Sequence, residues 1–200
     1  MSSPLRATTA LLALLLGACA TPDPPPVLLT LPPTVPLVAA PATTPARSAA
    51  EAPLLAVRRV AIPEYLLVRR VRYRADASTL ADWPHTFWAE RIEVAVSREF
   101  VSALRPALPQ WAVCEGNCPE RPPQATLQVE IVPMDYWRPQ RVLRARARMT
   151  ISTPGTTAPA RSFETSLELP AVTDSPQAQA EAISELLQRL AAVAAAALKN

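Results

Sequence analysis

Three cysteines are the residues best placed for chemistry, and the first of them ends an apolar segment near the N-terminus. Arg6 and the leucine-rich run 11–16 have the form of a signal peptide, because the run is far too short to span a bilayer. The run ends in Leu16-Gly17-Ala18-Cys19, which resembles the bacterial lipobox: two small residues before the cut and a thiol that accepts a diacylglyceryl group. We expect residues 1–18 to be a lipoprotein signal peptide and Cys19 to be the lipid attachment site. An ordinary signal peptide with an incidental cysteine is the alternative.

Acyl chains on Cys19 would hold the protein to a membrane. Each buried methylene contributes about 0.8 kcal/mol, so two or three chains anchor a protein almost irreversibly. In sorted lipoproteins an aspartate after the lipidated cysteine favours the inner membrane, and this chain has Ala20 there. We therefore expect a lipid-anchored protein on the periplasmic face of the outer membrane.

Cys114 and Cys118 enclose three residues of a predicted loop. Two cysteines that remain after lipidation pair most readily in an oxidising periplasm, and so small a loop gains about 2 kcal/mol from closure. A metal site needs more ligands than the one histidine, His85, can add, and a redox pair usually encloses two residues. A structural disulfide is therefore the prediction, with metal and redox sites as the weaker alternatives.

His85 is the one candidate for a general base, and no nucleophile motif places a serine or cysteine beside it. We therefore expect no catalytic residue, no metal and no cofactor, and hence no enzyme. A periplasmic hydrolase remains a hypothesis that requires His85, a serine and a carboxylate in one cleft.

The composition argues against nucleic acid and against phosphate-loop chemistry. The formal net charge of +3 becomes +2 once Arg6 leaves with the signal peptide, which is a weak field for nucleic acid. The chain has three glycines, and its one lysine is Lys199, so a glycine-rich phosphate loop with its lysine is absent.

Hydrophobic periodicity predicts six strands and two helices behind a proline-rich tether at 19–26. The strands are expected at 27–31, 54–62, 66–74, 127–131, 143–151 and 162–169. A helix is expected from about 87 to 104, ended by Pro106, and a second one after Ser175 as N-cap and Pro176. Residues 27–200 then form one domain with a long Pro/Ala-rich loop at 32–53. The fold class is α+β, an antiparallel or mixed sheet with two amphipathic helices packed on one face.

Two groups of side chains are candidates for binding. Arg144, Arg146 and Arg148 would form one cationic row, able to meet lipid phosphates or an acidic partner. Glu130, Glu164 and Glu168 on neighbouring strands favour a charge ladder instead.

The aromatic candidates for partner contact are Tyr65, Tyr136 and Trp137. The last two lie between Pro133 and Pro139, in what reads as an exposed connection between strands. Exposed aromatics often anchor interfaces, although a loop that packs back on the domain is an equal alternative.

The order and spacing of several segments resemble those of a known family. These segments are Leu28-Leu29-Thr30-Leu31 after the tether, Val60-Ala61-Ile62-Pro63-Glu64-Tyr65-Leu66, Trp88-Ala89-Glu90 at the expected start of a helix, and the closing helix around 184–191. Together they resemble the ABC-type transport auxiliary lipoprotein family of the PqiC type. The departures are Leu67-Val68, where the family often has Asp-Arg, and the added Cys114/Cys118 pair.

The resemblance implies a non-enzymatic subunit of an envelope lipid-transport system. Such lipoproteins accompany an ABC transporter, its permease and an MCE-domain protein that bridges the periplasm. The implied role is to dock the MCE assembly at the outer membrane and so support envelope integrity. A structural or assembly lipoprotein of another envelope complex is the second hypothesis, and the oligomeric state is left open.

Overall fold

The computed structural model describes residues 23–33, 52–116, 118–119, 121–156 and 159–199. The predicted signal peptide, Cys19 and most of the predicted loop at 32–53 lie outside these residues. Among the described residues, no helix is both long enough and apolar enough to cross a membrane.

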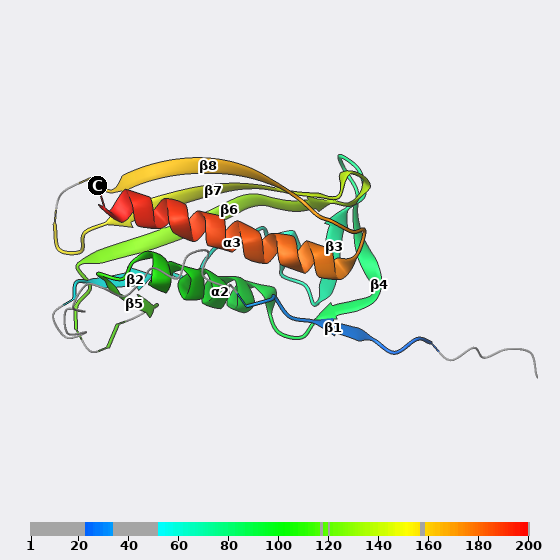
Figure 1. Ribbon diagram of the computed structural model, residues 1–200, viewed down its shortest axis with the longest axis horizontal. Coiled ribbons are helices and arrows are strands. Elements are labelled where there is room, and N and C mark those ends of the chain that lie inside the picture. Colours follow the sequence, from blue (N-terminus) through cyan, green and yellow to red (C-terminus); the bar gives the residue numbers. More distant parts are fainter. Residues whose placement is uncertain (1–22, 34–51, 117, 120, 157–158, 200) are drawn as a thin grey trace, which may run out of the picture.

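One mixed sheet of eight strands organises the described residues (Figure 1). The longest strand, β6 (Ala125–Trp137), lies at its centre. One edge of β6 pairs with β2 (Leu54–Val57) and, at its end, with β3 (Arg70–Arg74); the other edge pairs with β7 (Val142–Ser152). The remaining strands are β4 (Leu80–Trp88) beside β3, β1 (Val27–Leu29) beside β4, β5 (Ala112–Glu115) beside β2, and β8 (Arg161–Pro170) beside β7.

Two helices, α2 (Ile92–Ala107) and α3 (Pro176–Lys199), pack side by side on one face of this sheet (Figure 1). Their apolar stripes are buried against the inward side chains of β6 and β7. The core side chains include Val96, Phe100 and Leu104 of α2 and Leu186, Leu187 and Leu190 of α3. The predicted α+β fold, with both helices on one face, is confirmed.

The start of α3 also agrees with the sequence. The Oγ of Ser175 accepts a hydrogen bond from the backbone N–H of Ala178 at 3.2 Å, and Pro176 is the first helical residue. In α2, by contrast, Pro106 lies inside the last turn instead of ending the helix before it.

The prediction of a helix from residue 87 is wrong, because β4 continues to Trp88 and α2 begins at Ile92. Residues 83–86 of β4 stand opposite a single residue of β3, since Phe87 pairs with Arg70 and Asp82 with Arg72. His85 has a positive φ of 49° in this bulge. The bulge hides the period-two pattern, so the sequence reads as a polar loop where the chain forms a strand.

A second bulge, at Val132 and Pro133, decides which side chains of β6 face the helices. Ile131 pairs with Ala147 and Met134 with Ala145, so β6 advances by three residues while β7 advances by two. The extra residue reverses the alternation of faces. Before the bulge the odd-numbered residues point toward the helices, and after it the even-numbered residues do.

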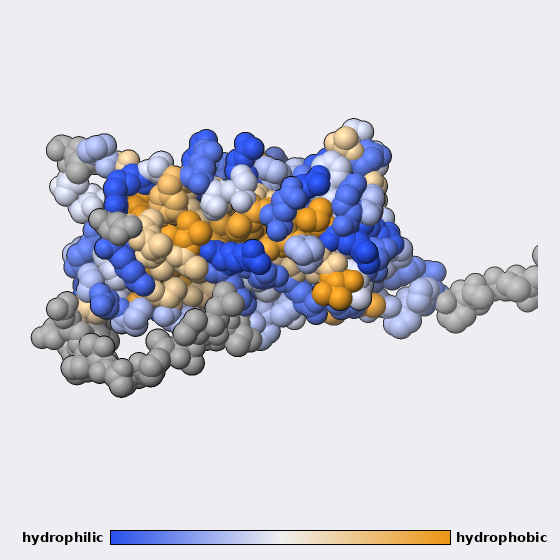
Figure 2. Space-filling model, turned by 45° about the horizontal axis from the view of Figure 1, so that its top comes forward, coloured by the Kyte–Doolittle hydropathy of each residue, from blue (hydrophilic) through white to orange (hydrophobic). Residues whose placement is uncertain are grey.

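The two sides of the sheet differ in character. The side chains of β7 and β8 that point away from the helices are mostly charged or hydroxylic, and we call this side the open face. On the helix side, the view with β8 turned forward shows a hydrophobic band bordered by hydrophilic side chains (Figure 2). The partly buried hydrophobics there include Phe163 and Leu167 of β8 and Val193 of α3, so α3 covers the edge strand only in part.

Candidate partner-binding surface

Tyr136 is not a surface residue, so its prediction as an exposed aromatic is wrong. The bulge at Val132 and Pro133 turns its ring toward the helices, where it is 2% exposed. Its hydroxyl has no hydrogen-bond partner among the described residues. Burial raises the pKa of this phenol above its ordinary value, and the charge of Asp174 adds to the effect.

The same bulge points Asp135 and Trp137 to the open face, where Asp135 becomes the centre of a polar cluster. The hydroxyl of Tyr65, from the short helix Glu64–Leu66, donates to Asp135 Oδ1 at 2.7 Å. The Nε of Arg74 donates to Oδ2 at 2.9 Å. The carboxylate is only 8% exposed, so both of its oxygens are satisfied by side chains rather than left to water alone.

Trp137 lies between two arginines on the open face. The guanidinium carbon of Arg74 is 5.6 Å from the centroid of the Trp137 ring, and that of Arg144 is 5.1 Å away. Arg144 also forms an ion pair with Glu168, with 3.1 Å between Nε and Oε1. Such cation–π contacts contribute about 0.5–1 kcal/mol each at exposed sites. We call Tyr65, Arg74, Asp135, Trp137 and Arg144 the Trp137 cluster.

The electrostatics of the cluster follow from this geometry. Burial, together with the hydrogen bond to the Asp135 carboxylate, raises the pKa of Tyr65 to about 12. Burial acts to lower the pKa of Arg74, but its hydrogen bond and ion pair with Asp135 outweigh burial and raise that pKa. The tyrosine therefore stays neutral and the arginine stays charged over the whole physiological range.

The predicted charge ladder continues from this cluster along the open face. Arg148 pairs with Glu164 across β7 and β8, with 2.8 Å between Nη2 and Oε1, and stands opposite Glu130 of β6. Arg146 differs because it stands opposite Ser166 and forms no ion pair with the described residues. The row is thus mostly neutralised, and Arg146 in its middle is the member that has no ion pair with the described residues.

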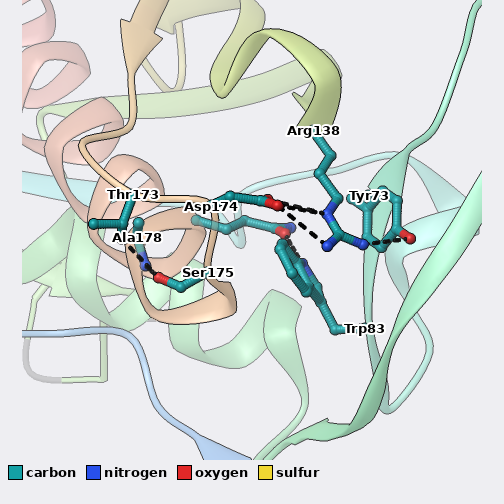
Figure 3. A network of polar contacts seen from close by, with 8 residues as sticks. Tyr73, Trp83, Arg138, Thr173, Asp174, Ser175 and Ala178 are labelled. Atoms are coloured by element: carbon teal, nitrogen blue, oxygen red, sulfur yellow. Dashed lines mark hydrogen bonds and ion pairs between the residues drawn. The ribbon is translucent and has the colours of Figure 1, made fainter.

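A second cluster braces the helix side at the same end of the sheet (Figure 3). Arg138 follows Trp137 directly, and its guanidinium lies 4.1 Å from the centroid of Trp83 and 4.9 Å from that of Tyr73. Arg138 pairs with Asp174 just before α3, at 3.0 Å, and donates to the Tyr73 hydroxyl at 2.9 Å. These contacts join the end of β6 to β3, β4 and the start of α3.

Comparison with known proteins identifies the family. The family model described as the ABC-type transport auxiliary lipoprotein component matches residues 36–195. The chain belongs to this family. As a member, it is an auxiliary lipoprotein component of ABC-type transport, and the family is not a known enzyme family. No curated protein matches the chain.

Two solved structures share the fold of this auxiliary lipoprotein. One, described as an uncharacterized protein, has a TM-score of 0.69 at 18% identity and covers 88% of this chain and 99% of its own. The other is protein XCC0632 from Xanthomonas campestris, of the DUF330 family, with a TM-score of 0.56 at 15% identity. It covers 86% of this chain and 90% of its own. At these identities the two structures show the fold alone.

The other residues singled out in this auxiliary lipoprotein lie away from the Trp137 cluster. Cys114 lies in β5, and its sulfur atom is joined to that of Cys118, with the two Cα atoms 5.9 Å apart. The His85 side chain is exposed and forms no hydrogen bond or ion pair with a serine or a carboxylate of the described residues. The described residues hold no group of three metal-ligating side chains.

Sequence reasoning identified Tyr65 and Trp137, which the structure brings together, but it missed Asp135 and Arg74 between them. The signal that could have found Asp135 is Pro133. A proline inside a run of strand residues is confined to edges and bulges, and a bulge reverses every later side chain. The motif Trp88-Ala89-Glu90 is also corrected, since Trp88 ends β4 at 5% exposure and does not open the helix.

Proposed function

We propose that this auxiliary lipoprotein is a docking adaptor of an MCE-linked, ABC-type lipid-transport system. Its lipid on Cys19 would hold it to the periplasmic face of the outer membrane. Its folded domain would hold the MCE-domain protein that bridges the periplasm, so that lipids pass between membranes. The protein itself would perform no chemical step, and its partners would be the MCE-domain protein and the transporter with its permease.

The observation that carries this proposal is the preorganised Trp137 cluster on an open sheet. Tryptophan, tyrosine and arginine dominate the binding energy of protein interfaces. Here Trp137 is held between Arg74 and Arg144, and Arg74 is fixed in turn by Asp135. Side chains that are ordered before binding lose less conformational entropy when a partner docks. The cluster therefore has the composition and the rigidity of an interface anchor.

The charges around the cluster suit a protein partner better than a simple anion. Asp135 and Glu168 already neutralise Arg74 and Arg144, so no concentrated positive field remains there to capture a phosphate. Arg146 adds an exposed cation two residues along the same strand. Alternating charges of this kind contribute mainly to the choice of partner and to its alignment in the interface. Both are needed to dock one particular partner.

Co-purification from native membranes tests this function. The lipidated wild-type protein should bring down an MCE-domain protein, its permease and its ATPase. Trp137→Ala should reduce this recovery at least tenfold, since interface hot spots contribute about 2 kcal/mol or more. Arg148→Gln is the control, because Arg148 lies on the same open face, on the neighbouring strand β7, and its ion pair with Glu164 is outside the cluster. It should change recovery little.

The same experiment separates the second hypothesis. Recovery of another envelope assembly without any MCE-domain protein would favour a structural or assembly lipoprotein and would contradict the proposal. If both variants lost the MCE-domain protein equally, this result would contradict the assignment of the Trp137 cluster as the docking surface.

A further inference from the structure

A patch of exposed hydrophobic side chains lies at the end of the domain that contains β1, the first strand. In β1, Val27 is 43% exposed and Leu28 is 55% exposed. In the loop before β3, Leu67 is 47% exposed and Val68 is 36% exposed. These four are most of the large hydrophobic side chains that the described residues expose. We call them the β1-end patch.

Strand pairing places the two halves of the patch close together. Leu28 of β1 pairs with Phe87 of β4, and Phe87 pairs with Arg70 of β3. Leu28 and Arg70 are therefore two strand spacings apart, which is about 10 Å. The backbone N–H of Trp88 donates to the carbonyl of Arg69 at 2.7 Å, so the loop with Val68 lies against the end of β4.

A groove opens beside the loop half of the patch. It has a volume of about 420 Å³ and is lined by Leu67, Val68 and Arg69 on one side. The start of α2, with Arg91 and Ile92, lines the other side. Apolar side chains at a surface with arginines at their margin are the composition that binds the interface of a lipid bilayer.

The charges at this end agree with an anionic surface. Arg69, Arg70 and Arg91 are all exposed. The Nε of Arg70 lies 4.0 Å from a carboxylate oxygen of Asp82, whereas Arg69 forms no ion pair with the described residues. The acidic residues of the groove are already paired, Glu90 with Arg98 at 2.6 Å and Glu93 with Arg91.

Glu64 is the exposed acidic residue nearest to the loop, since its carbonyl accepts from the backbone N–H of Leu67. Of the three arginines, Arg70 and Arg91 are paired with Asp82 and Glu93, and Arg69 forms no ion pair with the described residues. Three exposed guanidinium groups therefore border the hydrophobic side chains, and neighbouring carboxylates balance most of their charge.

The length of the tether brings this patch to the membrane. Cys19 precedes Val27 by eight positions, and a chain reaches at most about 3.6 Å per residue, so the lipid lies within about 30 Å of β1. We propose that the β1-end patch rests on the phospholipid bilayer as a second, shallow contact beside the lipid anchor. This inference rests on the proposed lipidation of Cys19. The contact would fix the orientation of the domain and so direct the open face toward its partner.

Fluorescence quenching in vesicles tests the contact. The full lipidated protein is reconstituted in vesicles of phosphatidylethanolamine and phosphatidylglycerol whose lipids are brominated near the top of the acyl chains. An environment-sensitive fluorophore is attached in separate proteins to Leu67→Cys and to Leu28→Cys, which report on the two halves of the patch. Thr150→Cys, on the open face of β7, is the matched control. The two patch positions should show severalfold more quenching than the control, and a blue-shifted emission.

Two results would overturn the inference. Equal quenching at all three positions would mean that the domain has no fixed contact. Quenching absent in vesicles, with the patch labels shielded only in native membranes, would assign the patch to a protein partner instead. Failure of the lipid anchor is distinguishable, because a protein without its lipid would not float with the vesicles at all. A variant that misfolds at one patch position leaves the other position as the reporter.

Discussion

The Nε–H of Arg74 on β3 donates a hydrogen bond to Asp135 Oδ2 on the neighbouring strand β6, at 2.9 Å. The Arg74 side chain is 15% exposed and that of Asp135 is 8% exposed. The pair exists because the bulge at Val132 and Pro133 turns Asp135 to the open face and because Arg74 pairs in register with Trp137. It holds the arginine against the indole ring. The geometry of the proposed docking surface thus depends on one nearly buried carboxylate.

Replacing Asp135 by alanine should therefore destabilise the fold. The change removes the hydrogen bonds from Tyr65 and Arg74 and leaves a nearly buried guanidinium without its counter-charge. We expect a loss of about 3 kcal/mol in the free energy of unfolding, measured by urea denaturation. Glu164→Ala is the control, because its ion pair is exposed and contributes at most about 1 kcal/mol. Equal losses for the two variants would contradict the structural role of Asp135.

The phenol of Tyr65 should titrate at a higher pH than an ordinary tyrosine. Its pKa in the folded protein is about 12, against 10.0 as the ordinary value, because of burial and the hydrogen bond to Asp135. The folded state holds this proton more tightly than the unfolded state, so the contribution to stability is complete below pH 10 and is lost as the pH rises toward 12. Absorbance of tyrosinate against pH should show a late-titrating group that Tyr65→Phe removes. An unchanged titration in that variant would contradict the assignment.

Cys114 and Cys118 should be closed as a disulfide in the mature protein. Thiol titration of the denatured, unreduced protein should find no free thiol from this pair and two after reduction. The double variant Cys114→Ser, Cys118→Ser should lose only about 2 kcal/mol of stability, because the loop is short. Recovery of both thiols without a reductant would show that the pair stays open.

Lipidation of Cys19 should decide where the protein resides. Metabolic labelling with palmitate should mark the wild-type protein and not Cys19→Ser, and the wild-type label should follow outer-membrane fractions. The physical reason is that two or three buried acyl chains are needed for stable anchoring. Label that follows inner-membrane fractions would contradict the location inferred from Ala20, without contradicting lipidation.

The strands that alternate cleanly were predictable from the sequence, and the irregular ones were not. The alternation of Leu143 to Ile151 matches β7 almost to the residue, because one face is buried and the other is solvated. β4 was missed because its bulge at 83–86 breaks the alternation. β5 was missed because it is a short strand inside a loop marked by cysteines, and only its pairing with β2 makes it a strand.

The candidate site was predictable in part for the same reason. Tyr65 and Trp137 were identified by residue type, but Tyr136 was assigned to the wrong side, since the sense of the alternation after Pro133 depends on a bulge. Asp135 and Arg74 are 61 positions apart in the sequence and lie on two different strands. Their pairing depends on sheet register, which a single sequence does not determine.

The most direct test of the docking proposal is photocrosslinking from the open face in intact cells. Ser166 is exposed on β8, two residues before Glu168 and on the same face. A photoreactive residue in its place should crosslink to an MCE-domain protein. The same residue in place of Ala192, exposed on α3 on the helix side, should not. A crosslink to the MCE-domain protein from Ser166 alone is the predicted result. Its absence from Ser166, or its presence only from Ala192, would contradict the proposal that the open face with the Trp137 cluster docks the partner.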